Sequence, residues 1–298
     1  MCWRIVRIQG DGSIKLILED KDAECNSADY TGNWNIGNGT FGTETINDIS
    51  GNTVRIPNFI KGELVSSIAP MVKLLYDFQT TELSAYKSQL QSEGWCYNDK
   101  AYDTKVVDET LSSLSSEEIE NNYKNGISIY YDTYIKSFEN RNVYDEDGNQ
   151  TVNDGLRSAS LICNGTILNN FKNHSNGDTV LTQDGAMYVG ALTADEIIYA
   201  GAISSLSLNG KSNTYLGNGE TTQFFTLTPS FYEIDGASSS TSAYAYWFYK
   251  GLLSYRKAVY TATGIRPSVV LKNGITLNTT IEGQNGTKTN PYVIATTS

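Results

Sequence analysis

The segment Cys2-Trp3-Arg4-Ile5-Val6-Arg7-Ile8 is followed by Gln9-Gly10-Asp11-Gly12 and then by Ser13-Ile14-Lys15-Leu16-Ile17-Leu18. Both outer segments are rich in β-branched residues, which favour strands, and the glycines between them are typical of a tight turn. The pattern predicts a β-hairpin at the start of the chain, with residues 2–8 and 13–18 as its strands.

A helix is predicted after Pro70, because apolar residues recur there at the spacing of one helical face. The residues at this spacing are Met71, Leu74, Leu75, Phe78, Leu83, Tyr86 and Leu90. The pattern ends before Gly94, so we expect the helix to end there.

Two further helices are predicted from capping boxes, in which Ser or Thr is followed three residues later by Glu. Ser115 and Glu118 mark the start of one helix, and Thr193 and Glu196 mark the start of a short one that Gly201 ends. Residues 224–228, 243–249 and 264–271 then indicate strands, with turn signals between them. No internal repeat or Pro/Ser-type linker divides the chain, so we predict a single α+β domain over residues 1–298.

Charge and composition limit the partners of the chain. Its formal charge is −11 and its Lys and Arg residues form no cluster, which argues against nucleic acid. No run of about 18 apolar residues is present, so we expect no membrane contact by this segment itself. The 20 tyrosines outnumber the 9 Phe and 4 Trp together, and amphipathic rings are typical of exposed recognition surfaces.

Met1-Cys2-Trp3-Arg4 leads directly into the first strand, without a signal peptide. The chain is therefore either cytosolic or a module of a longer exported protein. Its four cysteines, Cys2, Cys25, Cys96 and Cys163, lack zinc-site spacing and are even in number, which favours two disulfides in an oxidising compartment. Four reduced thiols are the alternative. We expect a place at the bacterial cell surface, outside the cell.

Four cysteines allow three pairings, and we predict Cys2–Cys25 and Cys96–Cys163. Cys2 begins the first strand and Cys25 lies just past the returning strand of the hairpin, so the turn brings them together. The second bond would join the end of the first helix to the loop before the third helix.

A series of segments, distributed in order over the chain, resembles a family of uncharacterised exported modules of gut Firmicutes and related bacteria. The segments are Cys2-Trp3-Arg4-Ile5-Val6-Arg7-Ile8, Gly10-Asp11-Gly12-Ser13, Trp95-Cys96-Tyr97-Asn98-Asp99-Lys100, Leu192-Thr193-Ala194-Asp195-Glu196-Ile197, Tyr199-Ala200-Gly201, Thr226-Leu227-Thr228-Pro229-Ser230, Arg266-Pro267-Ser268-Val269-Val270-Leu271-Lys272, Gly286-Thr287 and Asn290-Pro291-Tyr292-Val293-Ile294. These modules usually follow a membrane or pilin-like anchor, so the resemblance implies that the chain is part of a longer anchored protein.

The C-terminal segments also resemble C-type-lectin-like domains of the formylglycine-generating-enzyme type. This resemblance implies a C-type-lectin-like fold, with helices in the middle and residues 2–8 paired with residues 292–294. It implies a display surface near residues 230–262. The enzymatic activity is not carried over, because that chemistry needs cysteines late in the domain and none follows Cys163.

The best candidate for ligand binding is an aromatic cluster in the last third of the chain, with basic residues beside it. It consists of Tyr244, Tyr246, Trp247, Tyr249, Tyr255, Arg256 and Tyr260, and Lys257 lies in the same stretch. In a strand over residues 243–249, Tyr244, Tyr246 and Phe248 share one face, and Trp247 and Tyr249 take the other. One face must pack, so at most about half of these rings are free to bind.

The other candidate residues give little support for a catalytic or metal site. His174 is the only histidine, so a catalytic triad or a histidine metal site would have to use it, but it lies in a polar loop, where we expect it to be merely exposed. Asp195 and Glu196 point about 100° apart on a helix, so they cannot flank one glycosidic bond. Arg266 precedes an apolar strand, and we expect it to tie loop carbonyls together.

Asp145, Asp147, Asn149 and Thr151 are spaced like the start of a calcium loop. That loop needs glycine and a bidentate acid where Gln150 and Leu156 stand. We therefore expect a plain polar turn, no metal and no cofactor.

The function expected from these features is non-catalytic recognition, in an adhesin-like or pilus-tip module that binds a glycan or protein ligand. The alternatives are a structural spacer within a surface protein and, less favoured, a carbohydrate-active hydrolase.

Overall fold

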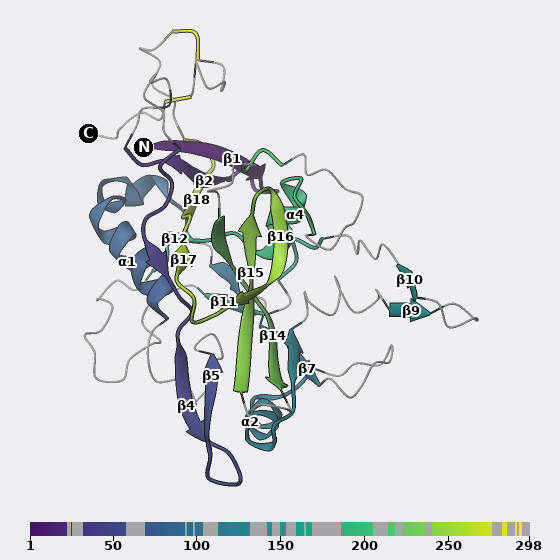
Figure 1. Ribbon diagram of the computed structural model, residues 1–298. Coiled ribbons are helices and arrows are strands. Elements are labelled where there is room, and N and C mark those ends of the chain that lie inside the picture. Colours follow the sequence, from purple (N-terminus) through teal and green to yellow (C-terminus); the bar gives the residue numbers. More distant parts are fainter. Residues whose placement is uncertain are drawn as a thin grey trace.

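The structure is a computed structural model of mixed α+β type (Figure 1). It describes residues 1–22, 25, 32–57, 69–92, 94–97, 99–103, 113–131, 142–144, 150–152, 159–163, 165–168, 186–204, 214–217, 223–235, 240–275, 282–284, 290 and 292–293.

The predicted N-terminal hairpin is confirmed and begins the smaller of the two main sheets. Strand β1 (Cys2–Ile8) pairs antiparallel with β2 (Ile14–Asp20). The sheet continues through β18 (Ser268–Leu271) to β12 (Val189–Gly190), in the order β1-β2-β18-β12. Residues from the start and from the last third of the chain therefore lie side by side.

The expected pairing of residues 2–8 with residues 292–294 is wrong for the described residues. Within them β1 pairs with β2, and Tyr292 and Val293 lie outside any strand. The late strand that joins the hairpin is β18, and it pairs with β2. The reason is burial, because β18 and most of β2 are buried while β1 is half exposed and occupies the edge.

The larger sheet has eight strands, in the order β13-β16-β15-β14-β17-β3, with β8 joined to β14 and β7 joined to β8. Its strands are β3 (Asn38–Gly39), β7 (Ala101–Asp103), β8 (Ile129–Tyr131), β13 (Ile203–Ser204), β14 (Gln223–Asp235), β15 (Ser240–Tyr249), β16 (Leu252–Ala258) and β17 (Thr263–Gly264). Long strands β14, β15 and β16 form its centre (Figure 1).

Three smaller strand pairs complete the β structure of the described residues. They are β4 (Thr43–Asn47) with β5 (Thr53–Pro57), β6 (Trp95–Tyr97) with β11 (Thr166–Leu168), and β9 (Asn142–Tyr144) with β10 (Gln150–Val152).

Helix α1 (Pro70–Thr81) begins at the predicted proline but ends earlier than predicted. A separate 3-10 helix, η1 (Ser84–Gln89), contains the later part of the apolar pattern. The α-helix ends at two threonines, and the hydroxyl groups of Thr80 and Thr81 both donate to the carbonyl of Asp77. Such side-chain bonds compete with continuation of a helix.

Both predicted capping boxes are confirmed. Helix α2 (Ser116–Asn125) has Ser115 as its N-cap and Glu118 as the reciprocal partner. Helix α4 (Ala194–Tyr199) has the same arrangement of Thr193 and Glu196. Gly201, in the left-handed region at φ +87°, follows the end of α4, as the turn there requires.

The larger sheet separates two buried apolar clusters. Neighbouring residues of its strands go to opposite clusters: Phe224 and Tyr246 lie in the cluster beneath α4, and Phe225 and Ala245 lie in the other. The second cluster also contains Leu16 and Leu18 of β2, together with β18 and α1 residues, so the two main sheets share one core.

Candidate functional site

Strand β15 carries four of the predicted residues, Tyr244, Tyr246, Trp247 and Tyr249, and its two faces differ as the alternation predicts. Tyr246 has 0% exposure and packs with Phe248 and Leu253 in the cluster beneath α4. A ring with no exposed surface cannot contact a ligand, so the assignment of Tyr246 to the binding surface is wrong.

Trp247 and Tyr249 lie on the opposite face of β15 and are half-buried. Their rings stack, with centroids 4.7 Å apart and an interplanar angle of 18°. The ammonium of Lys257 lies 4.4 Å from the centroid of the Trp247 ring, and that of Lys250 lies 5.1 Å from the centroid of Tyr249. We call these four residues the Trp247 platform.

The turn between β15 and β16 places one of the two cations. Lys250 and Gly251 both have positive φ, at 53° and 83°. Two such residues between paired strands form the type I′ turn that matches the twist of a hairpin. Lys250 was not among the predicted residues, although a Lys-Gly pair between two strand-like segments was a usable signal for this turn.

Tyr244 and Tyr255 belong to a second aromatic group, centred on the buried ring of Phe231. The Tyr244 ring stacks on Phe231 with centroids 4.5 Å apart, and the centroids of Tyr255 and Tyr130 each lie 6.0 Å from that of Phe231. Both tyrosines are half-buried. This group therefore packs against the sheet, with Tyr244 and Tyr255 partly covered by their neighbours.

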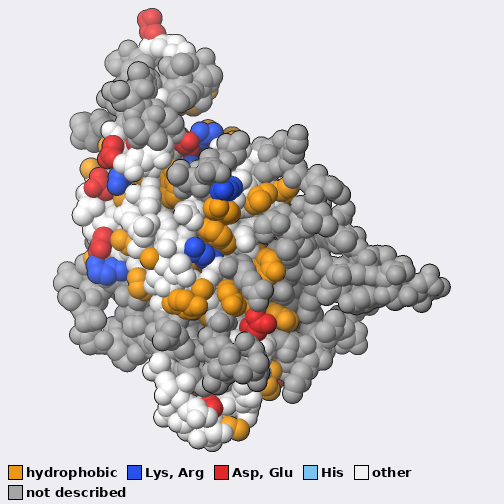
Figure 2. Space-filling view, in the orientation of Figure 1, with side chains coloured by type: hydrophobic (Ala, Val, Ile, Leu, Met, Phe, Trp, Pro, Cys, Tyr) orange, Lys and Arg blue, Asp and Glu red, His pale blue; other side chains and the backbone are white. Residues whose placement is uncertain are grey.

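The remaining predicted residues lie apart from the platform or cannot be placed. Tyr260 is 51% exposed, beyond the end of β16. The side chain of Arg256 lies outside the described residues, as do His174 and the predicted turn at residues 145–149. Figure 2 shows hydrophobic and basic side chains interspersed over the part of the surface that β15 and β16 occupy in Figure 1.

Arg266 is structural, as predicted. It is 1% exposed, and its Nε and Nη1 donate to the carbonyls of Leu18 and Leu216 at 2.7 and 2.6 Å. Its Nη2 pairs with Glu19 Oε2 at 2.5 Å. Burial is the main reason that the pKa of Arg266 falls to about 10, and the nearby charge of Glu19 opposes this fall.

Glu196, one of the two adjacent acids considered for hydrolysis, is buried and ion-paired. Glu196 Oε1 accepts from Lys15 Nζ at 2.6 Å and pairs with Arg7 Nη2 at 3.1 Å. Burial alone would raise the pKa of Glu196, but the charge and hydrogen bond of Lys15, the Thr193 N–H and the charge of Arg7 together lower it. A lowered pKa is the reverse of what a general acid needs.

Both predicted disulfides are present. The Cα atoms of Cys2 and Cys25 are 4.8 Å apart, and those of Cys96 and Cys163 are 5.5 Å apart. The second bond joins β6 to the loop before β11.

Within the described ranges, no group of three or more His, Cys, Asp or Glu side chains is placed to hold a metal ion. No helix in the described part of the chain is long and apolar enough to span a membrane. Comparison of the chain with protein-family models, with curated proteins and with solved structures found no match.

Proposed function

We propose that this chain is a non-catalytic recognition module of the bacterial cell surface, which binds a glycan or protein ligand through the Trp247 platform. The observation that carries the proposal is the half-buried stack of Trp247 and Tyr249, with an ammonium group over each ring.

The stack suits recognition because it is rigid before any ligand arrives. Each ring is held by its neighbour, and Trp247 also packs partly against the core, so little side-chain entropy is lost on binding. The exposed parts of the two rings offer apolar surface to a sugar ring or an apolar side chain. Lys250 and Lys257 add donors for hydroxyl or acidic groups at the edges.

The two disulfides support a place outside the cytoplasm, because such bonds persist in oxidising compartments. The C-type-lectin-like fold, the relation to exported modules of gut Firmicutes and an anchor elsewhere in a longer protein are part of this proposal. The pairing of the N-terminal hairpin with the late strand β18 supports a fold in which the start of the chain lies beside a strand from its last third.

The two alternatives fit the geometry less well. A spacer requires neither a stack of partly exposed rings nor a cavity, and this chain has both. A hydrolase requires two carboxylates that face one bond, with one held protonated, and the ion-paired Glu196 does not meet that need.

The test is binding of the purified disulfide-intact domain to arrays of host glycans and mucins, and to host surface proteins. Trp247→Ala and Tyr249→Ala should each abolish binding of whichever ligand the wild type selects, while the domain stays folded at the assay temperature. Tyr86→Ala serves as the matched control, because Tyr86 is an exposed ring on η1, away from the platform. Absence of any wild-type binding, or binding that survives both platform substitutions, overturns the proposal.

A further inference from the structure

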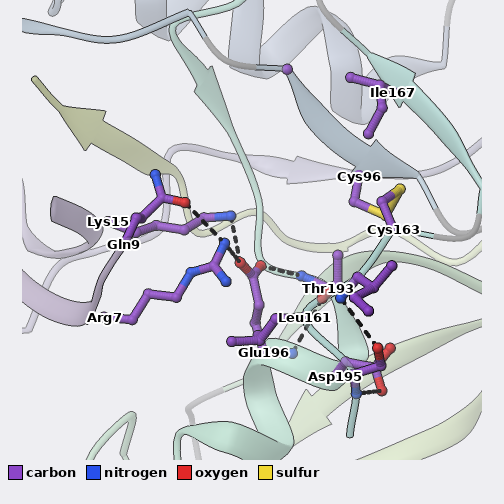
Figure 3. A pocket seen from close by; sticks show the side chains of 13 residues that line it. Arg7, Gln9, Lys15, Cys96, Leu161, Cys163, Ile167, Thr193, Asp195 and Glu196 are labelled. Carbon is purple, nitrogen blue, oxygen red and sulfur yellow. Dashed lines mark hydrogen bonds and ion pairs between the residues drawn. A yellow bond between two sulfur atoms is a disulfide. The ribbon is translucent and has the colours of Figure 1, made fainter. Parts of the chain in front are cut away.

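A cavity of about 190 Å³ lies between the N-terminal hairpin, helix α4 and the Cys96–Cys163 disulfide (Figure 3). Its lining combines the charged side chains of Arg7, Lys15 and Glu196 with apolar residues of the disulfide loop. It involves none of the residues of the Trp247 platform.

The charged end of the cavity holds two cations for one carboxylate. Figure 3 shows the Arg7 and Lys15 side chains converging on Glu196. Both cations contact the same oxygen, Oε1, while Oε2 accepts from the Thr193 N–H at 3.0 Å. Lys15 and Glu196 are each 6% exposed, so water screens this cluster little. These three groups together carry one excess positive charge, which the carboxylate of Asp195, elsewhere in the lining, offsets for the cavity as a whole.

Lys15 is held in place and balances Glu196 by itself. Its ammonium lies 4.6 Å from the centroid of the buried Trp95 ring and 2.6 Å from the carboxylate. Arg7 is the outer cation, with a side chain that is 25% exposed. Among the described residues it donates only through Nη2, to Glu196 and, at 3.4 Å, to Gln9 Oε1. The Nη1 amino group of Arg7 therefore keeps its donors for another acceptor.

The other side of the cavity is apolar and open. Leu161, Ile162 and Ile167 line it beside the disulfide, and they are 44%, 75% and 46% exposed. Exposed aliphatic side chains around a cavity are typical of a surface that a ligand covers.

Asp195 limits the charge that the cavity can accept. This second carboxylate also lines the cavity, and its Oδ1 accepts from the Ser160 N–H at 3.3 Å. A group with two negative charges would be repelled by Asp195 more strongly than a group with one.

We propose that this cavity binds a small monocarboxylate with an apolar body, which places its carboxylate at Arg7 and its body against Leu161, Ile162 and Ile167. A guanidinium forms strong charge-assisted bonds with a carboxylate, so the anion is recognised by charge and geometry together. The volume is below the roughly 300 Å³ at which pockets for drug-sized ligands begin, so the ligand is a small acid or the acidic end of a larger molecule. The site is independent of the platform and of the function proposed for it.

The test uses butyrate as the probe, with butyramide as its neutral counterpart and inorganic phosphate as the more highly charged anion. Binding to the disulfide-intact domain is followed by NMR shift changes or calorimetry. Butyrate should bind at least about tenfold more tightly than either comparison compound, since one ion pair of about 1.4 kcal/mol is worth a factor of ten. Equal affinities for butyrate and butyramide, or no binding of butyrate, overturn the proposal.

Arg7→Met should remove butyrate binding without unfolding the domain, because Lys15 still balances Glu196 and no buried charge is left unpaired. Leu161→Asp is a second variant at a half-exposed position, and its negative charge should also remove binding. Lys73→Met, which removes an exposed cation on α1, should leave binding unchanged. Retention of butyrate binding by both cavity variants contradicts the assignment.

N-acetylneuraminate distinguishes the source of the carboxylate. If this acidic sugar binds the wild type and fails to bind Arg7→Met, the cavity accepts the acid as part of a glycan. If N-acetylneuraminate does not bind, and butyrate binds the wild type but not Arg7→Met, the cavity accepts a free small acid.

Discussion

The indole ring of Trp95 occupies the space in which any side chain at position 190 would begin. A Cβ atom on Gly190 would lie 2.2 Å from Cδ2 of that ring, far inside the closest contact that real side chains show. The ring is buried, and its other contacts include the ammonium of Lys15. Gly190 therefore determines the position of Trp95 and, through it, the charged end of the cavity.

Gly190→Ala should lower the free energy of unfolding by about 1–3 kcal/mol or more, because the added methyl group displaces a large ring in a packed core. Urea denaturation of the two proteins measures the loss. Gly10→Ala is the matched control: its Cβ would have no neighbour within 4 Å, so its effect should be small. A Gly190→Ala protein as stable as wild type would show that Trp95 has room to move.

Glu196→Gln should lower the free energy of unfolding more at neutral pH than at acid pH. It leaves Lys15 and Arg7 without their counter-charge, and breaking a buried pair costs about 3–5 kcal/mol. Because the pKa of Glu196 is lowered by folding, its contribution is present above the unfolded value of about 4.3 and is lost as the pH falls through the lower folded value.

The stability difference between wild type and Glu196→Gln should therefore stay constant from neutral pH down to about pH 5 and shrink as the pH falls below the unfolded value of about 4.3, as measured by urea unfolding at each pH. Glu120→Gln is the control, since that acid forms a half-exposed pair with Lys124 on α2 and should show little change. A difference that stays constant with pH would mean that Glu196 does not titrate with folding.

Local signals explain which parts of the fold could be predicted from the sequence. The hairpin, both capping boxes and the Cys2–Cys25 bond depend on residues that are near one another in the chain, and all are confirmed. The alternation in β15 likewise predicted that Tyr246 and Trp247 would face opposite sides, although not which side would be buried. That choice depends on α4, about 50 residues earlier, which covers the Tyr246 face.

The cavity could not be predicted because its residues come from β1, β2, α4 and the disulfide loop, which only the complete fold brings together. One sequence signal did exist. Lys15 stands in the strand Ile14–Asp20 among apolar residues, and a lysine in such a strand must find a buried partner or a path to solvent. Its partner, Glu196, was assigned only to the capping box, where its other oxygen does take part.

Replacement of Cys96 and Cys163 by Ser should lower the free energy of unfolding by about 4 kcal/mol, as the chain-entropy model gives for a loop closed over 67 residues. Non-reducing peptide mapping of the wild type should yield Cys2–Cys25 and Cys96–Cys163 peptides. A Cys2–Cys96 or Cys2–Cys163 peptide, or four thiols that react with an alkylating reagent in the native protein, would contradict the pairing. The thiol result would also argue for a cytosolic protein.

Two substitutions in β15 should have different effects: Tyr246→Ala should lower chiefly the stability, and Tyr249→Ala chiefly the ligand binding. Tyr246 is fully buried beneath α4, so its truncation leaves a cavity and should cost about 3–5 kcal/mol of unfolding free energy. Tyr249 is half-buried and loses chiefly its stacking on Trp247, which is worth about 0.5–1.5 kcal/mol. Urea unfolding followed by circular dichroism compares the two losses directly. If both substitutions lower the free energy of unfolding equally, the two faces of β15 do not differ in burial. The loss of ligand binding expected of Tyr249→Ala could then no longer be ascribed to the Trp247 platform.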